Sequence, residues 1–356
     1  MKRLGKTILI MAGGTGGHIF PALAVADLLR DEGWRVIWLG NPGSMEDQLV
    51  PQHGYEIVHV RFAALRGKGI LRKFLLPINL LRGFWQASLV LRVVQPSVVL
   101  GMGGYVTFPG GVMAALMGIP LVVHEQNSIP GLANRVLAFF ARRVLTGFPD
   151  TLRKGAWVGN PVREAIARVK PLPERMGKAD DAPLNLLVVG GSLGAQALNE
   201  RIPEGLALLP PESRPQVVHQ SGEQHLEALE QRYAAAGVAA HCVSFIEDMA
   251  GAYEWADLVI CRAGALTIAE LAIAGVPSVL VPFPHAVDDH QTANAHFLAS
   301  AGGAFLMPQS ELTPEAVARI GNYERRHLLE MAAKAHALAH PRATREVAEV
   351  CKEIAK

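Results

Sequence analysis

The sequence predicts an α/β protein built from two Rossmann-like domains, each with its own parallel sheet. Short runs rich in Val, Ile and Leu alternate with longer helical patterns along nearly the whole chain, which is typical of parallel strands covered by crossover helices. Two similar glycine-rich turns follow apolar runs about half a chain apart. The chain has 356 residues, half of them apolar, and is too long for one ordinary core.

The expected strands are the apolar runs themselves. They are residues 7–12, 35–40, 56–60, 97–102, 120–125 and 143–147 in the first half, and 184–190, 216–220, 242–246, 257–261 and 277–283 in the second. Each half therefore forms a sheet of its own. Ligands of open α/β sheets bind at the carboxyl ends of the strands, and we expect a cleft where these ends of the two domains face each other.

The domain boundary is expected just after the Asn-Pro pair at residues 160–161. Residues 170–183 mix prolines with charged residues, as linkers do. The last helical stretch, residues 341–356, could pack on either domain, and we assign it to the N-terminal one. The two predicted domains are residues 1–162 and 163–340.

The first residues imitate a signal peptide, because basic residues precede an apolar run. The run is short and ends in glycines instead of a small-residue cleavage site, so we interpret it as a strand. No window offers the roughly 18 uninterrupted apolar residues of a membrane span. The three cysteines, Cys242, Cys261 and Cys351, lack metal-ligand spacing and cannot all pair, which favours free thiols in a reducing cytoplasm.

The net charge of +2 conceals an uneven distribution. Residues 1–160 hold 17 Lys and Arg against 8 Asp and Glu, whereas residues 161–356 hold 17 against 24. Such asymmetry indicates that the two halves face different partners.

Each half has a glycine-rich turn between a strand and a helix, at residues 13–17 and 190–194. Exposed amides at a helix start, together with the positive end of the helix dipole, suit an anion such as a diphosphate. A tight turn that binds nothing is the alternative for either loop alone.

The spacing of the first turn argues against a dinucleotide-dependent dehydrogenase. That fingerprint requires a glycine where Ile19 stands, and an acidic residue where the second strand ends in Gly40 and Asn41. The chain also lacks the G-x-x-x-x-G-K-[ST] pattern of a P-loop.

Glu270 lies in a helix that follows a third glycine turn, at Gly264. A carboxylate there can accept two hydrogen bonds from a ribose diol while the amides of residues 265–267 face phosphate. A solvated helix glutamate is the alternative. The buried strand before the turn favours the binding site.

Eight motifs in the same order, from about residue 7 to the C-terminus, resemble the MurG family. This family comprises bacterial enzymes that transfer N-acetylglucosamine from UDP-N-acetylglucosamine to lipid I, producing lipid II for peptidoglycan synthesis, and it has the glycosyltransferase B fold. The motifs are GGTGGH, GMGGYVTFPG, HEQNSIPGLANR, GNPVR, VVGGSLGA, FIEDM, RAGALTIAE and VPFPHAVDDHQTANA.

The resemblance implies that most donor-binding residues lie in the C-terminal domain. Ile246 would contact the uracil, with Arg163 nearby, and Glu270 would bind the ribose. The diphosphate would be bound by Ser192, Ala265, Leu266 and Thr267, next to Ile268 and Ala269. The sugar would be bound by Gln291 and Asn127. The first glycine loop, with Thr15, Gly16 and Gly17, would hold the acceptor's diphosphate and the sugar edge of the donor.

The implied reaction displaces UDP at the anomeric carbon and inverts an α-linked sugar to a β1,4 bond. It requires a base for the acceptor hydroxyl and stabilisation of the departing charge. His18, at the tip of the first loop, is the candidate base, because histidine titrates near neutral pH. A structural cap on the loop is the alternative for His18, and His124 and Glu125 are weaker candidates for the base.

Residues 285–290, HAVDDH, contain two histidines and two aspartates, but this is not a recognised ligand spacing. Helix amides can hold UDP without a metal. We therefore predict no fixed metal and no cofactor.

The stretch between Glu56 and Glu125 contains seven Lys or Arg and no acidic residue. If residues 74–94 are helical, their apolar side chains cover more of the circumference than one core-facing stripe requires. Peripheral binding to an anionic membrane, at the cytoplasmic face of the plasma membrane, explains this excess; a buried helix with snorkelling arginines is the alternative. The expected membrane-facing residues are Arg72, Lys73, Leu75, Arg82 and Trp85.

Two other functions fit the same motifs. One is another UDP-sugar enzyme of this fold, such as a UDP-N-acetylglucosamine 2-epimerase, which needs no acceptor. The other is a non-catalytic module that binds UDP-sugars or lipid diphosphates without turnover. Other cell-wall synthesis proteins are expected as partners, and nucleic acid is not.

Overall fold

The computed structural model describes residues 6–62, 70–175, 182–191, 194–321 and 323–356, and describes only the backbone of residues 70–76, 175 and 287. It divides into two compact units. The N-terminal unit is Met1–Arg163 with Pro341–Lys356, and the C-terminal unit is Glu164–His340. The predicted division lies one residue earlier, so Arg163 belongs to the N-terminal unit.

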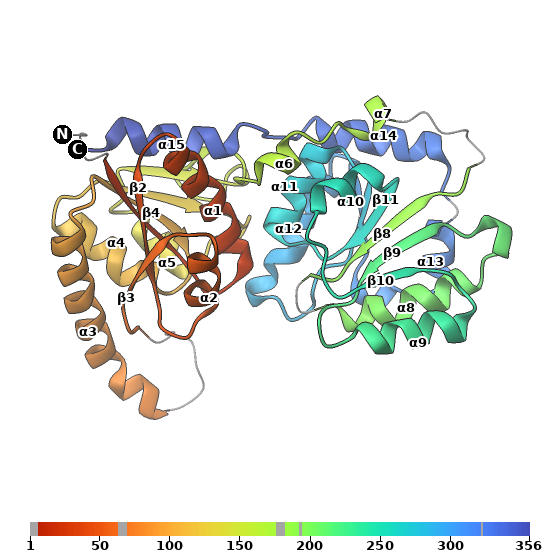
Figure 1. Ribbon diagram of the computed structural model, residues 1–356, viewed down its shortest axis with the longest axis horizontal. Helices are drawn as coiled ribbons and strands as arrows, with labels where there is room; N and C mark the ends of the chain where they lie inside the picture. Colours follow the sequence, from red (N-terminus) through yellow and green to blue (C-terminus); the bar gives the residue numbers. More distant parts are fainter. Residues whose placement is uncertain (1–5, 63–69, 176–181, 192–193, 322) are drawn as a thin grey trace. The chain divides into compact units, whose positions relative to one another are not determined.

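The N-terminal unit contains a seven-stranded parallel sheet in the order β3-β2-β1-β4-β5-β6-β7 (Figure 1). Its strands are β1 (Thr7–Ala12), β2 (Arg35–Gly40), β3 (Glu56–His59), β4 (Val98–Gly103), β5 (Leu121–Glu125), β6 (Arg143–Thr146) and β7 (Ala156–Trp157). Its helices are α1 (Gly16–Asp31), α2 (Met45–Gln52), α3 (Ile70–Val94), α4 (Thr107–Leu116), α5 (Leu132–Leu137) and α15 (Ala343–Ile354).

The C-terminal unit repeats this plan with a six-stranded parallel sheet in the order β10-β9-β8-β11-β12-β13. Its strands are β8 (Asn185–Val189), β9 (Gln216–Gln220), β10 (His241–Val243), β11 (Leu258–Cys261), β12 (Ser278–Leu280) and β13 (Ala304–Leu306). Its helices are α6 (Glu164–Ala167), α7 (Leu172–Arg175), α8 (Gln196–Ala207), α9 (Leu226–Ala236), α10 (Met249–Trp255), α11 (Ala265–Ala274), α12 (His290–Ala299), α13 (Pro314–Gly321) and α14 (Arg325–His336), with short 3₁₀ turns at Pro211–Ser213, Val287–Asp289 and Gln309–Glu311.

All eleven predicted strands are present. The expectation for residues 242–246 is partly wrong, because β10 ends at Val243. The expectation for residues 277–283 is also too long, because β12 is only Ser278–Leu280. Two short edge strands, β7 and β13, were not predicted. Among the described residues, no helix is both long and apolar enough to cross a bilayer.

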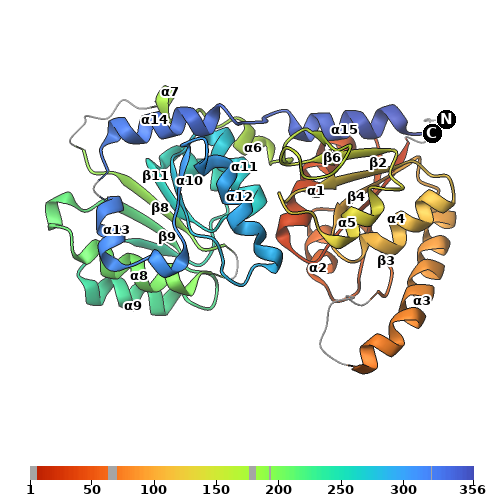
Figure 2. The same cartoon turned by 180° about the vertical axis from the view of Figure 1, so that it is seen from behind.

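Side chains of β1 show why the central strands are continuous apolar runs. Ile8 and Ile10 pack into a core with α1 and α15, whereas Leu9 and Met11 pack on the opposite face with α3, α4 and α5. Both faces of the strand are therefore covered, and every side chain from Ile8 onward is buried. Figure 2 shows the same covering of both faces from behind.

The C-terminal helix α15 packs on α1 within the N-terminal unit. Val347 and Cys351 are fully buried in the core that α1 shares with the sheet. At the surface, the Nζ of Lys352 lies 2.8 Å from a carboxylate oxygen of Glu32. The last segment of the chain thus completes the first domain.

The loop after β4 approaches the glycine turn after β1 so closely that only glycine fits. Gly104 has a φ of +88°, and a Cβ atom there would overlap the carbonyl oxygen of Gly13. The neighbouring atom belongs to the backbone, so it cannot move aside as a flexible side chain would.

We expect Gly104→Ala to lower the stability of the protein more than Gly33→Ala. Gly33 has a nearly identical φ of +87° but nothing within 4 Å of the added Cβ. Both variants incur about 1–3 kcal/mol of backbone strain. Only Gly104→Ala adds overpacking of about 1–3 kcal/mol. Thermal unfolding measures the difference, and equal melting temperatures would contradict the close approach.

Candidate active site

The C-terminal unit contains a cavity of about 670 Å³ at the carboxyl ends of β8 and β11. Its walls include the glycine turn before α8, the start of α11 and the segment Phe283 to His285. The predicted ligands Thr267 and Gln291 both line it. Ser192 lies outside the described residues.

The start of α11 provides amides for an anion. The helix begins at Ala265, as predicted, and its N-cap residue Gly264 has no side chain that could accept a hydrogen bond from the first turn. The first amides of a helix have no partner within the helix. Together with the helix dipole, they favour a phosphate group beside Thr267.

Arg262 is a residue that the sequence analysis missed. Its guanidinium lines the cavity, donates to the carbonyls of Val281 and Pro282 at 3.1 and 3.2 Å and to the Oε1 of Gln309 at 2.8 Å, and lies over the ring of Phe283. Burial lowers the pKa of Arg262. These contacts hold a cation with neutral partners at the cavity wall, an arrangement that suits a diphosphate.

The position of Arg262 in the sequence carried a signal. A charged residue comes directly after the four buried residues of β11 and directly before a glycine turn. In parallel sheets this is where ligands bind.

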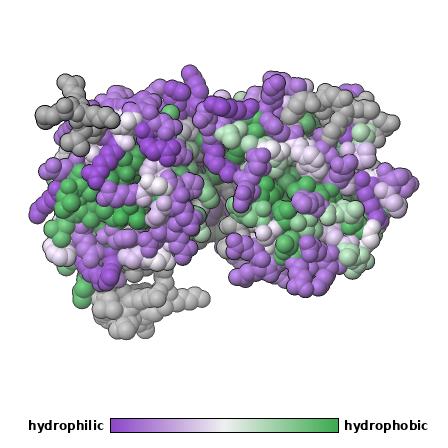
Figure 3. Space-filling view, viewed as in Figure 1, coloured by the Kyte–Doolittle hydropathy of each residue, from purple (hydrophilic) through white to green (hydrophobic). Residues whose placement is uncertain are grey.

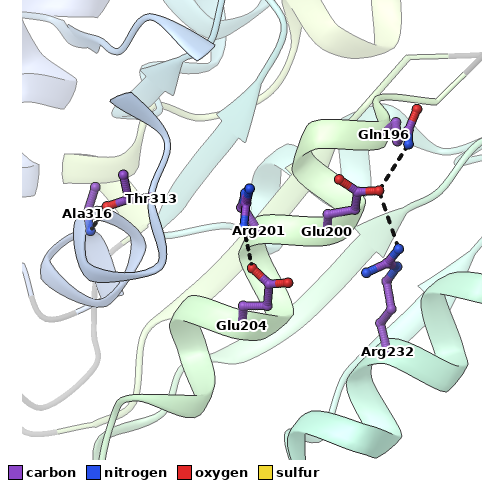
Figure 4. A network of polar contacts seen from close by, with 7 residues as sticks. All are labelled: Gln196, Glu200, Arg201, Glu204, Arg232, Thr313 and Ala316. Carbon is purple, nitrogen blue, oxygen red and sulfur yellow. Dashed lines mark hydrogen bonds and ion pairs between the residues drawn. The ribbon is translucent and has the colours of Figure 1, made fainter. Parts of the chain in front are cut away.

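Glu200 of α8 also lines the cavity, and its carboxylate is already hydrogen-bonded. Its carboxylate accepts hydrogen bonds from the side chains of Gln196 at 3.0 Å and Arg232 at 3.3 Å (Figure 4). The arginine of α9 offsets the negative charge that Glu200 brings to the cavity rim. Gln291 is also engaged, because its Oε1 accepts from the amide of Phe283 at 2.9 Å.

Glu270 lies in the second turn of α11, outside the residues that line the cavity. It is 6% exposed, and its carboxylate accepts a hydrogen bond from the hydroxyl of Tyr253 at 3.0 Å. The thiol of Cys261 nearby is inert, because burial and the charge of Glu270 raise its pKa to about 12. The solvated-glutamate alternative is therefore wrong.

The other predicted donor ligands are spread over the two units. Ile246 lies in the loop between β10 and α10, half-buried, and Leu266, Ile268 and Ala269 belong to the first turns of α11. Arg163 is exposed and is the last residue of the segment Met1–Arg163 of the N-terminal unit. Asn127 follows β5 in the same unit.

In the N-terminal unit, the glycine turn after β1 leads into α1. Thr15 is its N-cap residue and makes no side-chain cap hydrogen bond, so the amides of Gly16 and Gly17 stand at an uncapped helix start. Thr15 and Gly17 are exposed. This geometry is what an anion-binding turn requires.

A buried carboxylate that the sequence analysis missed fixes this turn. Glu46 of α2 is fully buried and accepts from the amides of Gly14 at 3.0 Å and Asn41 at 3.2 Å. A Cβ atom at Gly13 would lie 2.6 Å from the same carboxylate, so glycine is required there. Glu46 thus joins the loops that follow β1 and β2.

His18 is half-buried in the first turn of α1, and its Nδ1 lies 2.7 Å from the Oε1 of Gln126. The two weaker candidates for the base are buried and already engaged. Glu125 accepts from the amides of Asn127 and Gly131, and burial lowers the pKa of His124 to about 4. His18 is the one of the three with access to solvent.

The described residues contain no group of three or more His, Cys, Asp or Glu side chains arranged to hold a metal ion. In the HAVDDH segment, Asp288 and Asp289 have positive φ angles, and Asp289 accepts from the hydroxyl of Thr292 at 2.7 Å. This contact is that of a turn that starts α12.

Comparison with known proteins places these two sites in a family. Residues 8–146 match the glycosyltransferase family 28 N-terminal domain, and residues 185–353 match its C-terminal domain. The UDP-N-acetylglucosamine--N-acetylmuramyl-(pentapeptide) pyrophosphoryl-undecaprenol N-acetylglucosamine transferase of Dechloromonas aromatica is 69% identical over 99% of this chain and 100% of its own. The protein of the same name from Aromatoleum aromaticum is 63% identical over 98% of both chains.

A crystal structure of MurG from Acinetobacter baumannii has 43% sequence identity and a TM-score of 0.86, covering 98% of this chain and 99% of that one. A glycosyltransferase of kitacinnamycin, 19% identical with a TM-score of 0.71, shares the fold. The chain therefore belongs to the MurG family, within glycosyltransferase family 28.

Proposed function

We infer that this chain transfers N-acetylglucosamine from UDP-N-acetylglucosamine to lipid I, the undecaprenyl-diphospho-N-acetylmuramoyl-pentapeptide, and so produces lipid II for peptidoglycan synthesis. The observation that carries this function is the full-length identity to relatives named for this transfer. The resemblance in the sequence motifs pointed to the same reaction.

The donor binds, in our proposal, to the C-terminal unit. The uncapped start of α11 and the cation of Arg262 receive the diphosphate, and Gln291 on the same cavity wall contacts the sugar. As the bond to the sugar breaks, negative charge grows on UDP, and these fixed donors stabilise it. Glu270 takes the ribose hydroxyls.

The acceptor binds to the N-terminal unit, where the first turn of α1 holds its diphosphate. His18 removes the proton from the attacking sugar hydroxyl. Its location in that same turn supports this role, since a base must come within hydrogen-bond reach of the hydroxyl. The product is the inverted β1,4 linkage.

A strip of exposed apolar side chains on α3 supports a peripheral membrane surface. It consists of Ile78, Leu81, Trp85, Leu89 and Val93, between 40% and 84% exposed. Leu116 and Met117 extend this apolar surface at the end of α4, which packs on α3, and Figure 3 shows hydrophobic surface gathered over these two helices (green).

The charges on α3 favour an anionic membrane. The helix contains no acidic residue, and Arg82 and Arg92 are exposed beside the strip. The side chains of Arg72, Lys73 and Leu75 lie outside the described residues. Apolar side chains at the headgroup boundary with flanking cations are the features of an interfacial helix. These features support our proposal that the chain binds peripherally to the plasma membrane, at the cytoplasmic face, where lipid I would be within reach.

We expect His18→Ala to lower kcat for transfer from labelled UDP-N-acetylglucosamine to a lipid I analogue by about 10²- to 10⁴-fold. UDP binding should change little, because the donor site lies in the other unit. His53→Ala, a change of an exposed histidine at the end of α2, is the control. A kcat for His18→Ala within about threefold of the wild type would remove His18 as the base. Sugar epimerisation without acceptor, or UDP-sugar binding without turnover, would overturn the transferase assignment.

Glu270→Gln should raise the KM for UDP-N-acetylglucosamine by about 10- to 100-fold, because it weakens charge-assisted hydrogen bonds worth about 1.5–3 kcal/mol. Tyr253→Phe is the control, since it removes the hydroxyl that Glu270 accepts from and leaves the carboxylate in place. Steady-state kinetics with folded variants measure both. An unchanged donor KM for Glu270→Gln would exclude Glu270 from the site.

Vesicle sedimentation tests the membrane surface. Trp85→Ser and Arg82→Glu should each weaken binding to phosphatidylglycerol vesicles at low salt, and high salt should weaken wild-type binding. Leu208→Ser removes an equally exposed apolar side chain from the C-terminal unit and should have no effect. Equal sedimentation of all four proteins would contradict the proposal.

A further inference from the structure

Three polar side chains in the N-terminal unit form a chain of hydrogen bonds that ends at His18. The Nδ1 of His18 lies 2.7 Å from the Oε1 of Gln126. The Nε2 of Gln126 lies 2.9 Å from the Nδ1 of His124, and the Nε2 of His124 lies 2.9 Å from the carbonyl oxygen of Gly159. Gln126 and His124 are both at most 1% exposed, so water does not compete for these contacts.

The donor and acceptor of each of these hydrogen bonds can be assigned by starting from the contact between His124 and the carbonyl of Gly159. The carbonyl of Gly159 can only accept, so the Nε2 of His124 carries a proton. Burial lowers the pKa of His124 to about 4, so at neutral pH its ring has no second proton and its Nδ1 is an acceptor. Gln126 must therefore present its NH₂ group to His124.

A second contact fixes Gln126 in the same orientation. Its NH₂ group also donates to the backbone carbonyl of His124 at 2.9 Å, and that carbonyl can only accept. The Oε1 of Gln126 consequently faces His18. An amide oxygen cannot donate, so the Nδ1 of His18 carries the proton and donates to it. In neutral imidazole the other nitrogen, Nε2, then holds the lone pair.

We propose that Gln126, oriented by His124, is a positioning residue that holds His18 in the Nδ1–H tautomer and so makes its Nε2 the atom that accepts the proton of the acceptor hydroxyl. The inference rests on the proposed role of His18 as the base. Gln126 acts through the base and not on the reacting atoms. In the transfer step the sugar O–H bond breaks, its proton goes to Nε2, the oxygen bonds to the anomeric carbon, and the bond to UDP breaks with its electron pair leaving on the diphosphate.

The backbone also restricts the ring of His18. Gly103, at the end of β4, has a φ of +103°, and a Cβ atom there would lie 2.7 Å from the Nδ1 of His18. Glycine therefore leaves room for the ring on the side that faces Gln126. Ring and amide are held together by the close packing of three strand ends.

The other ionisable groups on the surrounding elements are engaged elsewhere. The carboxylate of Glu46 accepts from the amides of Gly14 and Asn41, and that of Glu125 accepts from the amides of Asn127 and Gly131. The hydroxyl of Tyr105, after β4, accepts from the side chain of Asn41. Within the described part of the chain, the hydrogen-bond partner of the His18 ring is thus a neutral amide.

The decisive measurement is the tautomer itself. In ¹⁵N-histidine-labelled protein, the signals that disappear in His18→Ala belong to His18, and their shifts should report Nδ1–H. Gln126→Met keeps the length of the side chain and removes all three of its hydrogen bonds, so it should abolish this preference. The Nε2–H form in the wild type would overturn the proposal.

Kinetics test the consequence. Gln126→Met should lower kcat by about 10- to 100-fold, at the weak end of the effect of losing a general base, with an unchanged KM for UDP-N-acetylglucosamine. Gln126→Glu still accepts from His18 but loses the NH₂ group that donates to His124, so it should restore only part of kcat. Its carboxylate stabilises the protonated imidazole, so the acidic limb of the kcat–pH profile should move to higher pH by about one unit.

The controls separate this proposal from the one on which it rests. Asn134→Ala removes another buried amide that donates to the carbonyl of His124, and should keep the tautomer and the pH profile. If His18→Ala retains kcat, the base assignment fails and the catalytic role of Gln126 fails with it. If His18→Ala loses activity but Gln126→Met stays within about twofold of the wild type, only the positioning role fails.

Discussion

The uncapped start of a helix after a buried parallel strand is the feature on which both candidate sites depend. At α1 the N-cap residue Thr15 leaves the first-turn amides without a side-chain acceptor, and at α11 the N-cap residue Gly264 cannot supply one. By contrast, α10 begins with Asp248, whose carboxylate accepts from the amide of Gly251 at 2.9 Å. Other helices, such as α2, α8 and α9, also lack a side-chain hydrogen bond at the N-cap, so it is the place of α1 and α11 after a buried strand that favours them as proposed anion sites.

Charge is arranged around these helix starts in opposite ways in the two units. In the N-terminal unit, the buried carboxylates of Glu46 and Glu125 bind amides of neighbouring loops and fix their course. In the C-terminal unit, Arg262 brings a positive charge to the cavity, and Arg232 pairs with the one glutamate among the lining residues. The first arrangement shapes a loop, and the second suits the negatively charged ligand that we propose.

The fold and the helix starts were predictable because their signals are local. A strand covered on both faces must be a continuous apolar run, and a close backbone approach must use glycine. The sequence therefore predicts both β1 and the glycine turn that follows it. The two residues of β7 are too few for an apolar pattern. The strand β13 has three residues, as do the predicted strands β10 and β12, so its length alone does not explain why it was missed. Glu46 and Gln126 could not be found this way, because their partners lie 32 and 108 residues away in the chain.

The neutral partner of His18 fits a site that must accept negative charge. In a Ser-His-Asp triad, an aspartate holds the histidine and stabilises its protonated form. A carboxylate in that place would add charge near the α1 turn, where the proposed acceptor brings a diphosphate, and Coulomb repulsion would oppose binding. The amide oxygen of Gln126 selects the same tautomer without adding charge. Its own orientation then has to be fixed by other means, and the buried, neutral ring of His124 with the carbonyl of Gly159 provides them.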